Sequence, residues 1–302
     1  MAIVGPTASG KSAVAMAIAR SRSDVELVSV DSMQVYRGMD IGTAKPTVVE
    51  RAEVPHHLVD LAPPSEDFSV ARFQELVAAA LAAIDDRGHR AVLVGGTGLY
   101  LRAVIDDLAI PGQWPEIRAA LEAEPDTAAL HRRLAGIDPL AVTRMEPNNR
   151  RRIVRALEVS LGSGHPFSSF GPGLESYPPT RFRLAGLRVP REVLALRIEQ
   201  RFHRMIDAGL VDEVHRLVRD HPMGLSRTAR QALGYRELLA HVEDGVPLQD
   251  CIARAVGRTL RFARRQEAWF RRDPRITWYE AGDNPLAVVS QVLGDWEQRC
   301  RP

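Results

Sequence analysis

The sequence predicts an α/β protein built on a parallel sheet, with a helical insertion and a mainly helical carboxy-terminal part. Three observations lead to this fold class. Short β-branched or apolar runs alternate with helical patterns in the first third of the chain, which is typical of a parallel sheet. Two proline and glycine clusters then bracket a stretch with helical periodicity and no clear strand. Long amphipathic patterns dominate the remainder.

Each element follows from a local pattern. The runs that read as strands are residues 2–4, 26–30, 91–94, 183–189 and 276–279. A helix is expected from near Pro190, because Leu194, Ile198 and Phe202 recur on one face, and a second long helix is expected at about 248–271. The first strand is short, which leaves open whether the native chain starts upstream of Met1.

The two proline and glycine clusters, at 111–115 and 171–179, set the predicted domain boundaries. Residues 1–112 and 179–302 are expected to form the α/β core. Residues 113–178 are expected to form the helical insertion.

Composition limits the class of protein. The chain has 302 residues, of which 45% are hydrophobic and 26% charged, as in folded soluble proteins. Its net charge is only +2, so affinity for a polyanion must come from local clusters. Cys251 and Cys300 cannot build a disulfide framework. No apolar stretch reaches the ~20 residues that a bilayer requires, and no secretory signal follows Met1. We expect a cytoplasmic protein without membrane contact.

The most informative short motif joins the first strand to the first helix. It has the form G-x4-G-K-S and is typical of a P-loop, so the expected core is P-loop NTPase-like. Backbone N–H groups would bind a phosphate chain, Lys11 would neutralise its oxygens, and the Ser12 hydroxyl would bind Mg²⁺. Lys11 and Lys45 are the only lysines among 40 basic residues. The flanking strand and helix disfavour a purely structural turn. The motif comprises Gly5, Pro6, Thr7, Ala8, Ser9, Gly10, Lys11 and Ser12.

A P-loop alone does not name the reaction, and a nucleotide-dependent kinase or NTPase is the default interpretation, with a small-molecule kinase that uses ATP as the rival enzyme. The run 91–94 ends in Gly95–Gly98 with no carboxylate, which counts against an ATPase. The run 26–30 does end in a carboxylate, Asp31. Because carboxyl ends of parallel strands face the ligand crevice, Asp31 and Thr97 are expected to converge near the phosphates. For Asp31, a helix cap or turn is the structural alternative.

Seven stretches together resemble the tRNA dimethylallyltransferases, also called tRNA isopentenyltransferases. The resemblance runs in family order over nearly the whole chain, and its most specific part is Asp31–Pro46. Asn149, Arg151 and Arg264 depart from the common residues, and Arg151 puts in doubt any contact that needs an amide there. The matching stretches are Gly5–Ser12, Asp31–Pro46, Val54–Asp60, Gly95–Tyr100, Pro147–Glu158, Gln231–Glu237 and Thr259–Gln266.

The resemblance implies transfer of a dimethylallyl group from dimethylallyl diphosphate to N6 of the adenosine immediately 3′ of the anticodon. The P-loop would then hold the diphosphate leaving group with Mg²⁺. By family correspondence Asp31 is the base, Lys11 and Thr97 act at the reacting centre, and Arg201 binds the diphosphate or tRNA. The implied contacts with the tRNA anticodon stem-loop are Asp31, Ser32, Met33, Gln34, Thr97, Arg118, Arg151, Arg152, Arg155, Gln231, Gly234, Tyr235 and Arg236.

Two arginine clusters are candidate phosphate contacts. One spans residues 150–155. The other, which we call the α-helical arginine stripe, recurs at helical spacing and comprises Arg254, Arg258, Arg261, Arg265 and Arg272. A solvated helix face in an arginine-rich protein is the alternative.

Two further pairs have structural interpretations. A structural or crevice-lining role is favoured over metal binding for His56 and His57, because neighbours in sequence seldom face one metal. A core role is favoured over base stacking for Trp269 and Phe270.

Three function classes remain distinguishable: a monomeric prenyltransferase that uses tRNA, a kinase that ignores tRNA, and a non-catalytic RNA-binding protein.

Overall fold

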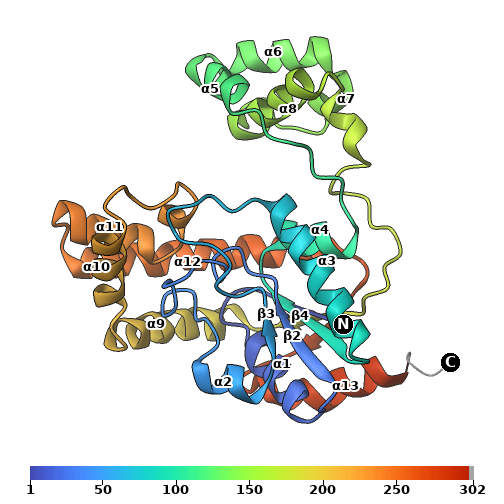
Figure 1. Ribbon diagram of the computed structural model, residues 1–302, viewed down its shortest axis with the longest axis vertical. Helices are drawn as coiled ribbons and strands as arrows, with labels where there is room; N and C mark the ends of the chain where they lie inside the picture. Colours follow the sequence, from blue (N-terminus) through green and yellow to red (C-terminus); the bar gives the residue numbers. More distant parts are fainter. Residues whose placement is uncertain (299–302) are drawn as a thin grey trace. The chain divides into compact units, whose positions relative to one another are not determined.

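The protein is described by a computed structural model that covers residues 1–298 (Figure 1). The chain divides into two compact units. The first contains Met1–Ile105 and the chain from Pro179 onward, and the second contains Asp106–Pro178. The second unit thus begins at Asp106, whereas the sequence analysis placed the start of the insertion at residue 113.

The first unit is built on one parallel sheet, which confirms the predicted α/β fold class. The six strands found in the described chain lie in the order β3-β2-β4-β1-β5-β6, and every neighbouring pair is parallel. Their bounds are β1 Ala2–Val4, β2 Val25–Ser29, β3 His56–His57, β4 Arg90–Gly95, β5 Leu184–Arg188 and β6 Ile276–Glu280. The short first strand is central and fully buried between β4 and β5.

Helices cover both faces of this sheet, and alternate residues of β1 point into the two cores. Ala2 and Val4 belong to one core, whereas Ile3 belongs to the other. The helices of this unit are α1 Lys11–Arg20, α2 Val48–Glu53, α3 Val70–Asp86, α4 Gly98–Ile105, α9 Arg191–Asp207, α10 Leu210–Asp220, α11 Tyr235–Asp244, α12 Leu248–Arg271 and α13 Val289–Gln298. Three 3₁₀ turns also occur in the described chain: η1 Phe167–Phe170, η2 Ala229–Gln231 and η3 Pro285–Val288.

The carboxy-terminal half of the first unit is mainly helical, as predicted. Pro190 precedes α9, whose buried face carries Leu194, Ile198 and Phe202. Helix α12 covers Leu248–Arg271, the predicted range, and packs against α9, α11 and α4 (Figure 1). These contacts bring α12 beside the start of α4, the helix that follows the carboxyl end of β4.

The second unit is helical, and no strand occurs within residues 106–178. Its helices are α5 Pro115–Ala123, α6 Thr127–Ile137, α7 Pro139–Thr143 and α8 Arg150–Ser163. They enclose a separate apolar core around Leu121, Leu134, Ile153 and Leu157. The unit therefore has the core that an independent domain requires.

None of the helices in residues 1–298 combines the length and the apolar character that crossing a membrane requires.

Candidate functional site

The P-loop lies between β1 and α1, as its sequence context predicted. Gly10 has φ +91°, a left-handed conformation that side chains rarely adopt. A Cβ there would also lie 2.4 Å from Cβ of Pro285, so both the backbone conformation and the lack of space require glycine at this position. Helix α1 begins at Lys11 without a side-chain cap on its first amides. Its amino terminus therefore presents N–H groups that suit an anion.

Lys11 and Arg201 form the positive centre of the site. Burial and the nearby Arg201 lower the pKa of Lys11 to about 8, while the Asp31 carboxylate opposes this shift. Burial also lowers the pKa of Arg201, again opposed by Asp31. Nη1 of Arg201 lies 3.5 Å from Oγ1 of Thr7, and Nζ of Lys11 donates to the Pro6 carbonyl at 3.2 Å. The structure thus brings together two cations and one carboxylate beside the P-loop.

Asp31 and Thr97 lie at the carboxyl ends of β2 and β4, where the sequence placed them. The Met33 amide donates to Oδ1 of Asp31 at 2.8 Å, so the turn expected as an alternative is present. The Ser32 amide lies 3.4 Å from Oγ1 of Thr97 and donates to it. The two loops are therefore adjacent. Turn formation by Oδ1 leaves the second carboxylate oxygen available for chemistry.

The segment Asp31–Pro46, which follows β2, is held by its own polar groups and by groups elsewhere in the chain. Oε1 of Gln34 accepts from the Ser29 hydroxyl at 2.7 Å, and Nε2 donates to the carbonyls of Thr43 and Ala44. Gln34 was predicted to contact tRNA. In this structure the side-chain amide of Gln34 is already hydrogen-bonded within the loop that carries Ser32 and Met33.

Glu213 of α10 supports the segment after β2, a role that sequence reasoning missed. Its buried carboxylate accepts the backbone N–H groups of Asp40 and Ile41 at 3.1 and 2.9 Å. The Tyr235 hydroxyl donates to the same carboxylate at 2.5 Å and accepts from the Gly42 amide. Because these partners are backbone groups distant in sequence, no local pattern could have revealed them.

The predicted contacts at 231–236 divide into exposed and buried residues. Gln231 and Arg236 are exposed and line one pocket together with Arg227. Tyr235 is fully buried, so its side chain supports the 40–42 turn and does not face solvent. Gly234 has φ +86°, and its amide donates to Glu237 at 3.0 Å.

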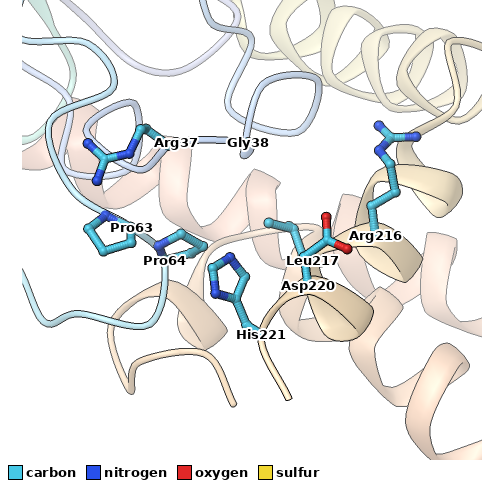
Figure 2. Close-up of a pocket in the computed structure, with 8 residues that line it drawn as sticks. All are labelled: Arg37, Gly38, Pro63, Pro64, Arg216, Leu217, Asp220 and His221. Carbon is cyan, nitrogen blue, oxygen red and sulfur yellow. The ribbon is translucent and has the colours of Figure 1, made fainter. Parts of the chain in front are cut away.

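A separate pocket lies between the segment after β2 and the end of α10 (Figure 2). Figure 2 shows Pro63 and Pro64 facing His221, with Arg37 and Arg216 at the rim. It contains none of the predicted site residues, and we assign no role to it.

The α-helical arginine stripe is not uniform, and its last member, the exposed Arg272, lies just beyond the end of α12. Arg258 donates to the buried Glu237 at 2.6 Å. Arg254, Arg261 and Arg265 are exposed. Arg258 is therefore a structural charge, whereas the exposed members remain candidates for phosphate contact.

Gln266, one of the buried residues of α12, is a second residue without an assigned role in the sequence analysis. Its side chain is buried among the loops of the site. Oε1 accepts from the Thr7 amide at 2.8 Å, and Nε2 donates to the Gly96 carbonyl at 2.7 Å.

In the second unit, the predicted arginines also differ in exposure. Arg118 and Arg155 both pair with the buried Glu158, at 3.4 and 3.0 Å. Arg151 and Arg152 are exposed at the start of α8. Of the arginines predicted to contact tRNA in this unit, Arg151 and Arg152 are therefore the accessible ones.

The histidine and aromatic pairs have the structural roles that were favoured. Nε2 of His57 lies 2.6 Å from Oε2 of Glu26, and Nδ1 of His56 lies 2.7 Å from the Val54 carbonyl. Phe270 is buried in the core, and Trp269 packs against it. Across residues 1–298, no group of three His, Cys, Asp or Glu side chains is arranged to hold a metal ion.

Comparisons with known proteins identify the family. The sequence profile of the family described as IPP transferase matches residues 34–273. The tRNA dimethylallyltransferase of Roseiflexus sp. is 50% identical over 98% of this chain and 98% of its own, and that of Kineococcus radiotolerans is 48% identical over 97% and 95%.

The solved structures that match agree with this result. The tRNA isopentenylpyrophosphate transferase of Bacillus halodurans matches with TM-score 0.70 and 38% identity over 98% of this chain and 96% of its own. A eukaryotic dimethylallyltransferase acting on tRNA matches with TM-score 0.77 and 26% identity over 99% of this chain and 76% of its own. The comparisons give no support to the kinase alternative. The chain belongs to the IPP transferase family.

Proposed function

We propose that this protein transfers a dimethylallyl group from dimethylallyl diphosphate to N6 of the adenosine next to the anticodon of tRNA, on its 3′ side. The observation that carries this proposal is the placement of Asp31 beside Lys11 and Arg201, at a P-loop whose neighbouring strand β4 ends without a carboxylate. A carboxylate beside an anion site suits a base acting next to a leaving group. The names of the relatives support the same reaction.

The positive centre suits the departing group. When the bond between C1 of the dimethylallyl group and the diphosphate oxygen breaks, negative charge grows on the diphosphate. Lys11, Arg201 and the first amides of α1 would stabilise that charge in a partly buried site, where such interactions are strong. Binding energy realised mainly at this stage accelerates the chemical step.

Asp31 is the proposed base. The N6 amine is a weak nucleophile because its lone pair is delocalised into the adenine ring. As N6 forms its bond to C1, a proton leaves N6 for the Asp31 carboxylate. Oδ1 is occupied by the Met33 amide, so Oδ2 is the oxygen that we assign to this proton. The adenine must leave the anticodon loop stack to reach the site, as in other base-modifying enzymes.

Mg²⁺ fits this site as an ion held mainly by the substrate. The Ser12 hydroxyl is exposed in the first turn of α1, and no acidic cluster for an all-protein site occurs in residues 1–298. Mg²⁺ commonly binds through one or two protein groups and substrate phosphates. When bound, it would supply further positive charge to the diphosphate.

The exposed arginines are proposed tRNA contacts. Arg151 and Arg152 in the second unit, and Arg254, Arg261 and Arg265 on α12, offer charge for phosphates. Gln231 and Arg236 are the proposed contacts near the target base. We further propose that the protein acts as a cytoplasmic monomer, and sedimentation of the purified protein tests the oligomeric part.

The deciding experiment mixes the protein with Mg²⁺, unmodified tRNA and either labelled dimethylallyl diphosphate or labelled ATP. We expect label to move to tRNA from the prenyl donor only. Movement of the ATP label to a small molecule would favour the kinase. Tight tRNA binding without transfer of either label would favour a non-catalytic RNA-binding protein.

A further inference from the structure

We infer that Gln266 is a positioning residue for the proposed prenyl transfer, because its single side-chain amide ties the P-loop to the turn that carries Thr97. The inference rests on the proposed function and adds a residue to it. Gln266 does not itself face the substrate. It acts through the Thr7 amide on one side and the Gly96 carbonyl on the other.

The two hydrogen bonds use opposite ends of the same amide. Oε1 accepts from the Thr7 N–H at 2.8 Å, and Nε2 donates to the Gly96 carbonyl at 2.7 Å. The side chain is buried, with the residue 7% exposed, so water cannot replace either partner without cost. One planar group therefore fixes the distance between two loops that come from different strands.

Each loop carries a group of the proposed chemistry next to the atom that Gln266 binds. Thr7 is the P-loop residue whose hydroxyl lies 3.5 Å from Nη1 of Arg201. Gly96 immediately precedes Thr97, whose hydroxyl accepts from the amide next to Asp31. A shift of either loop would move the diphosphate site relative to the base.

Close packing makes this bridge specific. A Cβ on Gly96 would lie 2.4 Å from Nε2 of Gln266, and a Cβ on Gly98 would lie 2.2 Å from Nε1 of Trp269. Gln266 and Trp269 are one turn apart on α12. Because Gly96 and Gly98 have no side chains, Gln266 and Trp269 can pack directly against the turn that carries Thr97. This turn therefore lies in contact with α12.

The first test replaces Gln266→Met, which keeps the length of the side chain and removes both hydrogen bonds. We expect the single-turnover rate of prenyl transfer to fall about 10²-fold, the usual effect of displacing a reacting group by about 1 Å. Affinity for tRNA should stay within twofold of the parent. Phe270→Leu is the matched control, because it reduces a buried side chain of the same helix and leaves both Gln266 hydrogen bonds in place.

The second variant, Gly96→Ala, leaves Gln266 chemically intact. Its new methyl group would lie 2.4 Å from Nε2 of Gln266 and 3.2 Å from the Gly5 carbonyl, so the amide must move and the rate should fall by a similar factor. Because both substitutions break one bridge, the double variant should be no slower than Gln266→Met alone. Multiplication of the two losses would overturn the inference, and so would a rate for Gln266→Met within threefold of Phe270→Leu.

A binding measurement separates this inference from the proposed function. Inorganic diphosphate with Mg²⁺ should bind Gln266→Met about tenfold more weakly than the parent and Phe270→Leu, since the P-loop loses its support. If the parent transfers no prenyl group, the proposed function fails, but this comparison still tests the bridge. Equal diphosphate affinity in all three proteins would refute it.

Discussion

The P-loop and the segment Asp31–Pro46 each carry one of the two lysines, and they use the same charge in opposite ways. Lys45 is buried and donates to the Tyr36 carbonyl and to the carboxylates of Asp40 and Asp60, at 2.7, 2.5 and 2.6 Å. Lys11 donates to a single carbonyl, and no ion pair of Lys11 occurs within the described chain. A neutralised lysine stabilises a loop, whereas one left without a carboxylate partner can bind an anion.

The chemical environment of the two loops shows the same contrast. Although burial opposes it, hydrogen bonds from Lys45 and Arg51 hold the pKa of Asp60 below its ordinary value. Burial and Arg201 instead lower the pKa of Lys11 to about 8. The P-loop thus carries an uncompensated charge that the binding of diphosphate would neutralise.

The largest expected effect comes from Lys11→Ala. Removing the charge should lower the rate of prenyl transfer at least about 10³-fold, because it acts mainly as the leaving group departs. The free energy of unfolding in urea should not fall, since no ion pair is lost. Turnover at the parent rate would contradict the assignment of the P-loop to the diphosphate.

The next largest effect concerns Asp31, whose carboxylate raises the pKa of both Lys11 and Arg201 against the effect of burial. Asp31→Asn should lower the single-turnover rate about 10²-fold or more, the usual contribution of a positioned base, because an amide cannot accept the N6 proton. Affinity for tRNA should be retained, and a filter-binding assay checks this. A rate within a few-fold of the parent would make Asp31 a turn-forming residue only.

Lys45→Met tests the structural role that we give to the lysine of the segment Asp31–Pro46. It removes the shorter hydrogen bond of the Tyr36 carbonyl, which keeps only the Met39 amide at 3.4 Å, and it leaves the carboxylates of Asp40 and Asp60 without their shared cation. The free energy of unfolding should therefore fall by about 2–3 kcal/mol. Urea denaturation measures this loss. Affinity for dimethylallyl diphosphate should stay within threefold of the parent. A weakened donor site with full stability would reverse the roles that we give the two lysines.

The pKa of Lys11 predicts a pH dependence. Above pH 8 the free protein loses the Lys11 proton, and binding a diphosphate then requires that proton to be taken up again. Affinity for dimethylallyl diphosphate should therefore fall toward tenfold per pH unit between about pH 8 and 9.5, which calorimetry can follow. Lys11→Arg keeps its charge in this range and should give a flat profile. A parent profile as flat as that of Lys11→Arg would contradict the prediction.

The smallest effect extends the comparison to α12. Neutralising the exposed Arg254, Arg261 and Arg265 should flatten the dependence of tRNA affinity on salt by up to about three counterion equivalents. Donor affinity should not change. Arg258→Gln is the matched control: its ion pair with Glu237 makes it structural, so it should lower thermal stability and leave the salt slope unchanged. An unaltered slope in the triple variant would make this face a solvated surface.

Local patterns predicted the fold well. The P-loop, helix α12 and strands β1, β2, β4, β5 and β6 follow from periodicity and motif spacing, because each pattern is complete within a short window. Strand β3 was missed because it has only two residues, His56 and His57, which were weighed as ligands or crevice-lining residues. Its pairing with β2 depends on a neighbouring strand that no local pattern identifies.

The site residues could be predicted where the chemistry requires a particular residue type. The residues that hold the loops of the site from distant parts of the sequence could not be predicted. Asp31 and Thr97 follow the carboxyl ends of β2 and β4, and Lys11 begins the helix after β1, so topology brings them together. Glu213 and Gln266 bind backbone groups 173 and 259 residues away. Nearly every residue type offers the same backbone groups, so the sequence does not show which of them a side chain will bind. The ion pair of Arg258 with Glu237 was missed for a different reason: the two residues lie on different helices, α12 and α11, and no local pattern relates them.

The order of the strands has a consequence for biosynthesis. Strand β1 emerges from the ribosome first, yet it lies between β4 and β5, and β5 follows the whole of residues 106–178. A nascent chain that has not yet passed residue 188 therefore presents one unpaired edge of its central strand. Unpaired apolar edges invite association with other chains. The second unit has its own core and can fold during this interval, so translation speed through residues 106–188 sets how long that edge stays open.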